Sequence, residues 1–274
     1  MTDAYAVFGN PIGHSKSPRI HAAFAHSTRQ DIRYAAIEAP LGGFAEALRA
    51  FRASGGRGAN VTAPFKLDAY AAADALSERA LAAGAVNALK FEQGRVLGEN
   101  FDGVGLVRDI EANLRFSLAG RRVLLLGAGG AARGAAPALL ARHPAALVIA
   151  NRHPGKAQEL AAALAPLGGV DACGYDDLAR RPPFDVVLNS TSASWSGERP
   201  PAPSACFARG GLAYELVYGK GLTPFLAQAK AAGAEVLADG VGMLVEQAAE
   251  AFLWWRGVRP DTRPVIAALT IPLE

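Results

Sequence analysis

The stretch RVLLLGAGGAA, Arg122–Ala132, decides the fold. Its apolar run Arg122–Leu126 is typical of a buried strand, and the glycines that follow open an Ala-rich helical stretch. This order matches the Gly-x-Gly-x-x-Gly/Ala turn of a dinucleotide-binding βαβ unit, with Ala132 in the last position. Gly127 permits the tight turn, and Gly129 lets the backbone approach a pyrophosphate at the helix N-terminus. We therefore predict a cofactor loop made of Gly127, Ala128, Gly129, Gly130 and Ala131.

The sequence around this loop alternates β-rich apolar runs with Ala- and Leu-rich helical stretches. That rhythm indicates the α/β class, with a parallel sheet covered by helices on both faces. The second half thus reads as a Rossmann-like, doubly wound domain. Its expected strands are Arg122–Leu126, Ala146–Ala150, Asp185–Asn189, Leu212–Leu216 and Glu235–Ala238. Its expected helices are Ala131–Ala141, Lys156–Ala165 and Pro224–Ala232.

The first part of the chain shows the same alternation and predicts a second α/β lobe. Its expected strands are Tyr5–Gly9, Arg33–Ala39 and Gly58–Val61, and its expected helices are Pro18–Ala25, Gly43–Ser54 and Leu67–Ala72. A helix from Asp102 to about Arg115 leads to the second lobe, and an amphipathic helix Met243–Trp255 returns. We predict a substrate domain at residues 1–104 completed by residues 239–274, and a cofactor domain at 105–238, with a hinged cleft.

The composition indicates a globular protein and argues against disordered, nucleic-acid-binding and membrane proteins. The chain has 274 residues, 51% hydrophobic and 19% charged, with a net charge of +3. This favours two compact lobes and excludes a disordered chain, and no charge run marks a nucleic-acid arm. No signal peptide or apolar segment of about 18 residues is present, so we expect a cytoplasmic protein without membrane contact. Two cysteines, Cys173 and Cys206, suggest buried thiols, and the five histidines show no metal-binding spacing, so no metal is predicted.

The end of strand Ala146–Ala150 indicates which dinucleotide binds. An NAD enzyme usually carries Asp or Glu there to bind the ribose 2′-hydroxyl. This chain has Asn151 and Arg152, which lack the repelling carboxylate and offer a guanidinium that can bind a 2′-phosphate. Lys156 lies one helical turn further and either adds a second charge or is a solvated surface lysine. The predicted cofactor is NADP.

Polar residues recur at loop positions along the whole chain. The first lobe has Gly9–Pro18 with two serines, then Asn60–Lys66, Gly84–Asn87 and Glu99–Gly103. The second lobe adds the segments Asn189–Ser192, Tyr218–Pro224 and Asp239–Ala248. In order and spacing, this set resembles the shikimate dehydrogenase family over essentially the full length.

The resemblance implies reversible reduction of 3-dehydroshikimate to shikimate by NADPH, a step of aromatic amino-acid biosynthesis. It implies that Lys66 and Asp102 form the catalytic pair, because a ketone that accepts hydride becomes an alkoxide and needs a nearby acid. The implied substrate-binding residues are Ser15, Ser17, Thr62, Lys66, Asn87, Asp102, Tyr218 and Gln247. Thr191, Gly240 and Met243 are further implied cofactor-binding positions. Ser17 also suits a helix N-cap ahead of Pro18.

Four positions depart from the residues that are commoner in the family. Phe101 stands where Thr is usual before the Asp, Ala88 where Thr follows Asn, Glu215 where Asp is usual, and His153 where Thr or Ser follows Asn-Arg. The proposed catalytic pair is unaffected. His153 bears on the strictness of NADP preference, and Phe101 on the packing beside the substrate pocket.

Two alternatives stay open. A quinate or dual quinate/shikimate dehydrogenase would offer the same kind of pocket to a ring carboxylate. A non-catalytic NADP-sensing module would keep the fold without turnover, because fold does not determine function. The sequence also leaves a homodimer possible.

Overall fold

The computed structural model describes residues 2–273. Its internal contacts divide the chain into two units: Met1–Gly105 with Val245–Val265, and Leu106–Leu244 with Ile266–Glu274. The boundaries that we expected differ from these at three places: Gly105 belongs to the first unit, and residues 239–244 and 266–274 belong to the second. Each unit contains one six-stranded sheet.

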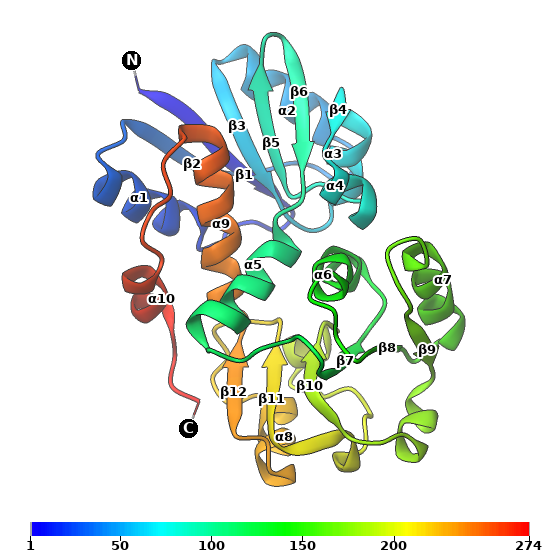
Figure 1. Cartoon of the computed structure of the whole chain (residues 1–274). Helices are drawn as coiled ribbons and strands as arrows, with labels where there is room; N and C mark the ends of the chain where they lie inside the picture. Colours follow the sequence, from blue (N-terminus) through cyan, green and yellow to red (C-terminus); the bar gives the residue numbers. More distant parts are fainter. Residues whose placement is uncertain (1, 274) are drawn as a thin grey trace. The chain divides into compact units, whose positions relative to one another are not determined.

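The second unit is built on a fully parallel sheet (Figure 1). The strand order is β12-β11-β10-β7-β8-β9, which from the other edge is the doubly wound order with the first strand at the centre. The strands are β7 (Arg122–Leu126), β8 (Ala146–Ala150), β9 (Asp171–Cys173), β10 (Phe184–Asn189), β11 (Phe207–Glu215) and β12 (Val236–Asp239). The helices are α6 (Gly130–Leu140), α7 (Pro154–Leu164) and α8 (Pro224–Ala232). The predicted Rossmann-like architecture is confirmed.

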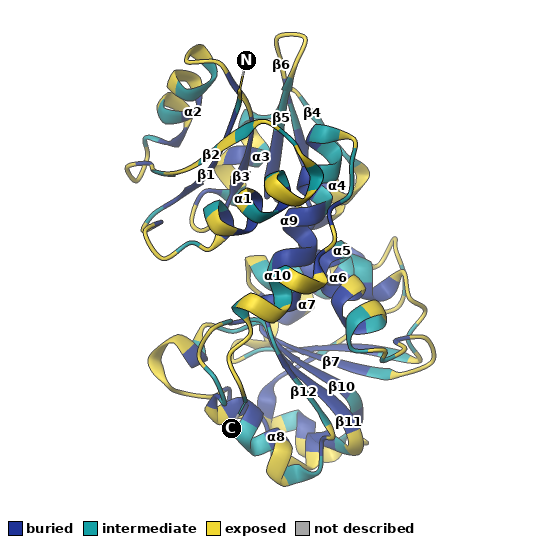
Figure 2. Cartoon of the chain, turned by 90° about the vertical axis from the view of Figure 1, so that its left-hand side faces the viewer, coloured by how far each residue is buried: buried dark blue, intermediate teal, exposed yellow. Residues whose placement is uncertain are grey.

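Successive side chains along the strands point to opposite faces of the sheet, so this unit has two hydrophobic cores. Val123 and Leu125 pack with α6 and α7, whereas Leu124 and Leu126 pack with α8 on the opposite face. Burying both faces explains why the central strands are continuous apolar runs, and Figure 2 shows them buried over most of their length. Cys206 is a free thiol in the α8-side core, where burial raises its pKa to about 12.

The first unit contains a mixed sheet in the order β2-β1-β3-β5-β6-β4. Its strands are β1 (Asp3–Gly9), β2 (Ile32–Glu38), β3 (Gly56–Val61), β4 (Ala75–Leu76), β5 (Ala88–Glu92) and β6 (Arg95–Glu99). β1 pairs in parallel with β2 and β3, but β5 runs antiparallel to both β3 and β6. The α/β class holds for this unit, but we did not predict the β5–β6 hairpin, whose antiparallel pairing departs from the parallel sheet that the alternation indicated.

Helices cover both faces of the first sheet. They are α1 (Ser17–Thr28), α2 (Phe44–Ala53), α3 (Lys66–Ala72) and α4 (Glu78–Ala83), together with the long α9 (Val241–Arg256). Phe8 packs with Phe44 of α2 on one side. On the other side Tyr5 stacks on Trp255 of α9 at 4.7 Å. The Trp255 indole N–H donates to the Leu89 carbonyl at 3.0 Å, so this tryptophan is a core residue.

Two helical segments complete the chain. The helix that we expected from Asp102 to about Arg115 is α5 (Asp102–Arg108), followed by a π-helical turn, Asp109–Asn113. The short α10 (Arg263–Leu269) follows α9 and was not predicted. Among the described residues, no helix combines the length and apolar character needed to cross a bilayer.

Candidate active site

The glycine turn after β7 has the backbone that its sequence requires. Gly127 has φ of +104°, and a Cβ there would lie 2.7 Å from Ser190 Oγ, so both conformation and space demand glycine. A Cβ on Gly129 or Gly130 would meet no protein atom within 4 Å. The N-terminus of α6, which begins at Gly130, is therefore open to a ligand, and its first turn contains no acidic residue. This arrangement suits a bound pyrophosphate.

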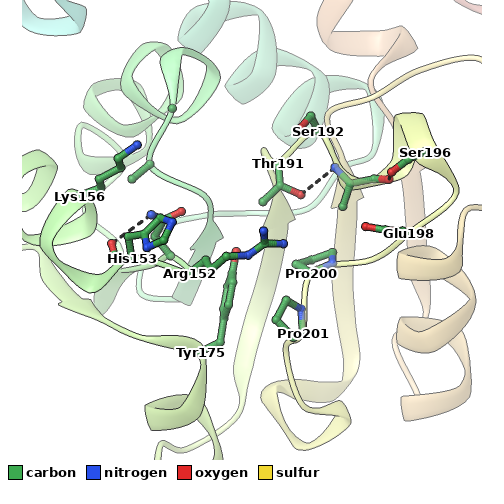
Figure 3. A pocket seen from close by; sticks show the side chains of 14 residues that line it. Arg152, His153, Lys156, Tyr175, Thr191, Ser192, Ser196, Glu198, Pro200 and Pro201 are labelled. Carbon is green, nitrogen blue, oxygen red and sulfur yellow. Dashed lines mark hydrogen bonds between the residues drawn. The ribbon is translucent and has the colours of Figure 1, made fainter.

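A pocket of about 490 Å³ lies beside this turn (Figure 3). Its lining consists of Ala128, Gly129, Asn151, Arg152, His153, Lys156, Tyr175, Thr191, Ser192, Ala193, Ser196, Glu198, Pro200 and Pro201. Six of the predicted cofactor residues are among them: Ala128, Gly129, Asn151, Arg152, Lys156 and Thr191. The structure thus brings the glycine turn, the end of β8 and the loop after β10 to one pocket.

The charges in this pocket favour a phosphorylated ligand. Arg152 and Lys156 contribute two cations, and Figure 3 shows the Arg152 side chain extending from the β8 wall toward the Thr191 and Pro200 wall. Burial raises the pKa of the Tyr175 phenol, and the nearby Arg152 opposes that rise. Glu198 is the one carboxylate among the lining residues, and it lies on the wall opposite β8. The residues therefore fit a dinucleotide with an additional phosphate on its ribose.

Gly240 and Met243 are not among these lining residues and lie at the junction of β12 and α9. A Cβ on Gly240 would approach the Leu216 carbonyl oxygen to 2.2 Å, so close packing against the backbone requires glycine. The Met243 backbone N–H donates to the Tyr214 hydroxyl at 3.2 Å, and its side chain packs on the α6-side core. These contacts give both residues a structural role, and their proposed contact with the cofactor stays a prediction.

In the first unit, the loops that follow the parallel strands β1 and β3 carry two of the polar motifs. The Asn10 backbone N–H donates to the Ala63 carbonyl at 3.2 Å, which ties the loop after β1 to the loop after β3. On the first loop, Ser15 Oγ accepts from the Ser17 N–H at 3.3 Å. Ser17 itself is buried inside the first turn of α1, whose N-cap is Lys16 without a side-chain cap bond, so the expectation that Ser17 caps this helix is wrong.

Lys66 and Asp102 form an ion pair in this unit. Lys66 Nζ lies 2.5 Å from Asp102 Oδ2, and the two side chains are 24% and 9% exposed. Asn87 donates to the other carboxylate oxygen, Oδ1, at 2.8 Å. The same amide lies 3.4 Å from Gln247 Oε1, which brings α9 to the cluster. Four of the residues predicted from the resemblance thus meet at one place.

Backbone pairing explains why these distant residues meet. The Val61 N–H donates to the Asn87 carbonyl at 2.8 Å, and the Asn87 N–H donates to the Glu99 carbonyl at 3.0 Å. Asn87 therefore lies between the ends of β3 and β6. Lys66 begins α3 shortly after β3, and its carbonyl accepts from the Val86 N–H at 3.0 Å. The β5–β6 hairpin that we did not predict is the element that positions Asn87 and Asp102.

Several residues near the pair had no role in the sequence analysis. Asn100 Oδ1 accepts from the Asp102 N–H at 3.0 Å and holds the start of α5. Glu99 is buried and binds Arg79 at 2.5 Å. Asn60 Nδ2 donates to the Asn87 carbonyl at 3.4 Å. Asn60, Glu99 and Asn100 belong to the motifs quoted above, but the motif pattern did not indicate their hydrogen-bond partners. Arg79 lies outside every motif, so no feature of the sequence pointed to its role.

Phe101 points into the core rather than disrupting the site. It is 4% exposed and packs edge-on against Trp254 with ring centroids 5.8 Å apart. The Arg79 guanidinium lies over the same ring at 5.4 Å. The Phe101 N–H still donates to Asn87 Oδ1 at 2.9 Å, so the backbone contact survives the unusual side chain.

Tyr218 belongs to the second unit rather than to the Lys66–Asp102 cluster. Tyr218 lies in the loop after β11 of the second unit, and burial raises its pKa. The neighbouring Gly219 N–H donates to Asp239 Oδ2 at 2.9 Å and anchors this loop. Within residues 2–273, no group of three or more His, Cys, Asp or Glu side chains is arranged to hold a metal ion.

Comparison with known proteins supports the same interpretation. Three family models match in succession: the shikimate dehydrogenase substrate-binding domain at residues 7–89, shikimate/quinate 5-dehydrogenase at 110–196, and the shikimate 5′-dehydrogenase C-terminal domain at 240–270. The chain is 58% identical over 269 residues to shikimate dehydrogenase (NADP(+)) of Nitrosospira multiformis, covering 98% of both chains.

Solved structures agree with the sequence matches. The chain is similar to an Ael1 enzyme from Pseudomonas putida, with a TM-score of 0.93, 56% identity and full coverage of both chains. It is also similar to shikimate 5-dehydrogenase of Thermus thermophilus, solved with NADP(H) and shikimate, with a TM-score of 0.88, 32% identity and 98% of both chains covered. With a full-length relative at this identity and all three family models matched in order, the chain belongs to the shikimate dehydrogenase family.

Proposed function

We propose that this protein catalyses the reversible reduction of 3-dehydroshikimate to shikimate with NADPH as the hydride donor. The observation that carries the proposal is the Lys66–Asp102 ion pair oriented by Asn87, in a chain whose other unit has a glycine turn and a basic ribose pocket. Relatives named shikimate dehydrogenase (NADP(+)) share more than half of its residues over their full length.

The cofactor would be held by the second unit. The open N-terminus of α6 suits the pyrophosphate, and Arg152 with Lys156 suits the 2′-phosphate. NADPH supplies the hydride for the ketone carbon. The remaining proposed cofactor contacts are Gly127 to Ala131, Asn151 and Thr191, together with Gly240 and Met243.

Side-chain hydroxyls and amides of the protein would bind the carboxylate and the ring hydroxyls of the substrate. Side-chain hydroxyls and amides can donate to a carboxylate without placing a second charge in the site. The proposed ligands are Ser15, Ser17, Thr62, Asn87, Tyr218 and Gln247, together with the Lys66–Asp102 pair. Several directional hydrogen bonds to the carboxylate and the ring hydroxyls would favour one orientation of the ring.

Lys66 would supply the proton in the reductive direction. As the C–H bond forms, the C=O π electrons move onto oxygen, and that alkoxide takes a proton from the Lys66 ammonium. Lys66 then regains a proton from water. Asp102 accepts from Lys66 through Oδ2 and can also accept from a substrate hydroxyl. The Asn87 amide, which donates to Asp102 Oδ1, restrains rotation of the Asp102 carboxylate. In the oxidative direction, neutral Lys66 removes the hydroxyl proton.

The test is to measure oxidation of shikimate and of quinate, each with NADP⁺ and with NAD⁺. The proposal predicts the highest kcat/KM for shikimate with NADP⁺. Comparable turnover of quinate with NAD⁺ would instead support a dual enzyme. NADP⁺ binding without turnover in any of the four combinations would support a sensing module and contradict the proposal. The cytoplasmic location and the homodimer stay predictions.

A further inference from the structure

We propose that Glu215 is a positioning residue whose buried carboxylate holds the wall of the NADP pocket and the Tyr218 loop in one fixed arrangement. The inference rests on the proposed function, because it assigns the pocket to NADP. Glu215 is not among the proposed substrate or cofactor ligands, and it stands where Asp is usual in the family.

Glu215 lies at the end of β11 and is fully buried. Its carboxylate collects donors from three separate segments. Oε2 accepts from Asn189 Nδ2 at 3.0 Å, from Ser194 Oγ at 2.5 Å and from Thr223 Oγ1 at 3.3 Å. Oε1 lies 3.4 Å from the Val217 backbone N–H. Asn189 ends the adjacent strand β10 and is the register partner of Glu215.

The Asn189 contact transmits this arrangement to the cofactor pocket. Because Asn189 donates its amide to Glu215, its Oδ1 is free to accept, and it binds the Thr191 N–H at 3.1 Å and the Thr191 hydroxyl at 2.7 Å. Thr191 lines the pocket. Ser190 between them donates to the Leu126 carbonyl at 2.6 Å and packs against Gly127. Rotation of the Asn189 amide would therefore displace the loop from the glycine turn.

The Ser194 contact anchors the other part of the same wall. Ser194 is 4% exposed and lies in the 3₁₀ turn Ala193–Ser196, both ends of which line the pocket. Loss of the carboxylate would leave a buried hydroxyl without its acceptor, which is costly enough to move a short turn. Glu215 thus holds the pocket wall at two points, Asn189 and Ser194.

The remaining contacts tie the Tyr218 loop to this wall. Thr223 caps α8 by accepting from the Leu226 N–H at 3.3 Å while it donates to Glu215. Val217 and Thr223 thereby fix both ends of the loop that carries Tyr218. A second link lies at the surface, where Lys220 Nζ sits 5.0 Å from the centroid of the Trp195 ring. The proposed substrate ligand and the cofactor wall therefore share one anchor.

The chemistry of the cluster explains why a carboxylate is used. Within residues 2–273 no basic side chain pairs with Glu215, and burial raises its pKa. Such a group is expensive to bury unless every lone pair is satisfied. A carboxylate has no donor of its own and can accept from all four groups, whereas a glutamine would present an N–H₂ group to one of these donors. An aspartate is one methylene shorter and would stretch contacts to three segments.

The experiment compares Glu215→Gln and Glu215→Asp with wild type. The dissociation constant of NADP⁺ is measured by calorimetry without substrate, and kcat and KM are measured for both substrates. We expect Glu215→Gln to raise the Kd of NADP⁺ and the KM of NADPH by about 10-fold, with a rise in the KM for shikimate and kcat at saturation within about 3-fold. Glu215→Asp, which keeps the charge, should recover part of this loss.

Asp185→Asn is the matched control. Asp185 is a carboxylate at the opposite, amino end of β10 and accepts from the Arg122 N–H at 2.8 Å. The Asp185→Asn variant should have a lower Tm than wild type and an unchanged Kd for NADP⁺. If Glu215→Gln fails to fold, Ser194→Ala replaces it, with an expected rise in Kd of about 3-fold or more.

The outcomes separate this inference from the proposed function. A folded Glu215→Gln, or the substitute Ser194→Ala, with wild-type Kd and KM would overturn the positioning role. An equal rise in Kd for Asp185→Asn would also overturn it, because general destabilisation would then explain the effect. Wild-type protein that binds NADP⁺ but does not turn over 3-dehydroshikimate would contradict the proposed function and leave the Glu215 comparison intact. Absence of NADP⁺ binding would contradict both.

Discussion

The side-chain amide of Asn87 donates a hydrogen bond of 2.8 Å to Oδ1 of Asp102, while Lys66 binds the other oxygen. Asn87 is itself held, because its Oδ1 accepts from the Phe101 N–H at 2.9 Å. The Asp102 N–H in turn donates to Asn100 at 3.0 Å. The carboxylate is therefore oriented by the protein before a ligand arrives, which is the condition for efficient proton transfer to a bound ketone.

Removing the proposed acid should slow the chemical step. We expect Lys66→Ala to lower kcat by about 100-fold or more and to change the KM for shikimate by less than about 3-fold. Steady-state kinetics in both directions measure this. Lys90→Ala is the control, since Lys90 is 25% exposed and pairs with Glu92 at 3.0 Å in the same unit. A Lys66→Ala enzyme with normal kcat would exclude Lys66 as the proton donor.

Removing the orienting amide should also impair turnover. In Asn87→Ala, Asp102 Oδ1 loses a donor and can rotate away from its proposed position, so we expect kcat/KM to fall by about 10- to 100-fold. Asn113→Ala is a matched change, because Asn113 Nδ2 also donates to a carboxylate, Asp109 Oδ1, at 2.8 Å in the other unit. An unchanged kcat/KM for Asn87→Ala would show that Asp102 needs no such support.

Prediction from the sequence was strongest where one local segment carries the whole signal. The turn Gly127–Gly130 and the strand before it contain the required glycines and apolar residues. The second unit has the five expected strands, and the edge strand β9 (Asp171–Cys173) is the one that was not predicted. The motif pattern also named Lys66, Asn87 and Asp102, which the structure brings together.

Prediction failed where long-range pairing decides the structure. The β5–β6 hairpin was missed because Ala88–Glu92 and Arg95–Glu99 contain charged residues and depend on β3 for one of their neighbours. The hydrogen-bond partners of Glu215 could not be predicted either. They are Asn189, Ser194 and Thr223, whose segments come together only when the parallel sheet forms. Such networks have no spacing in the sequence that could indicate them.

The basic ribose pocket should determine the preference for NADP. We expect Arg152→Ala to raise the KM for NADPH by about 10- to 100-fold and to leave the KM for NADH nearly unchanged, because only NADPH carries the 2′-phosphate. Initial rates with each cofactor test this. Arg180→Ala is the control, since Arg180 is exposed, pairs with Asp177, and neither residue lines the pocket. Equal loss with both cofactors would contradict the assignment of Arg152.

A buried histidine should make the first unit sensitive to acid. Burial lowers the pKa of His21 to about 3, with a smaller opposing effect from Asn60. Tyr34 donates to Asn60 Oδ1 at 2.7 Å and Asn60 Nδ2 donates to the Asn87 carbonyl, so His21 Nε2 carries the hydrogen toward Asn60. Nδ1 has no partner among the described residues. His21 is thus neutral in the folded state.

The sign of the pH effect follows from this neutrality. Between pH 6.5 and about 3 the unfolded chain binds a proton at His21 that the folded chain does not. The free energy of unfolding should therefore fall with decreasing pH by up to about 1.4 kcal/mol per pH unit from this residue. His21→Phe keeps a ring against Tyr34, at 4.2 Å in the wild type, and should remove this component in chemical denaturation between pH 6.5 and 4. His26→Phe, an exposed position on α1, should retain it; an unchanged slope in His21→Phe would refute the assignment.

Transfer of a labelled hydride tests the central claim most directly. The protein is incubated with 3-dehydroshikimate and NADPH that carries deuterium at both C4 positions of the nicotinamide, and the product is analysed by mass spectrometry. The account predicts shikimate that contains one deuterium on the former ketone carbon, formed at a rate that falls about 100-fold in Lys66→Ala. Unreacted 3-dehydroshikimate, or a product without deuterium at that carbon, would contradict it.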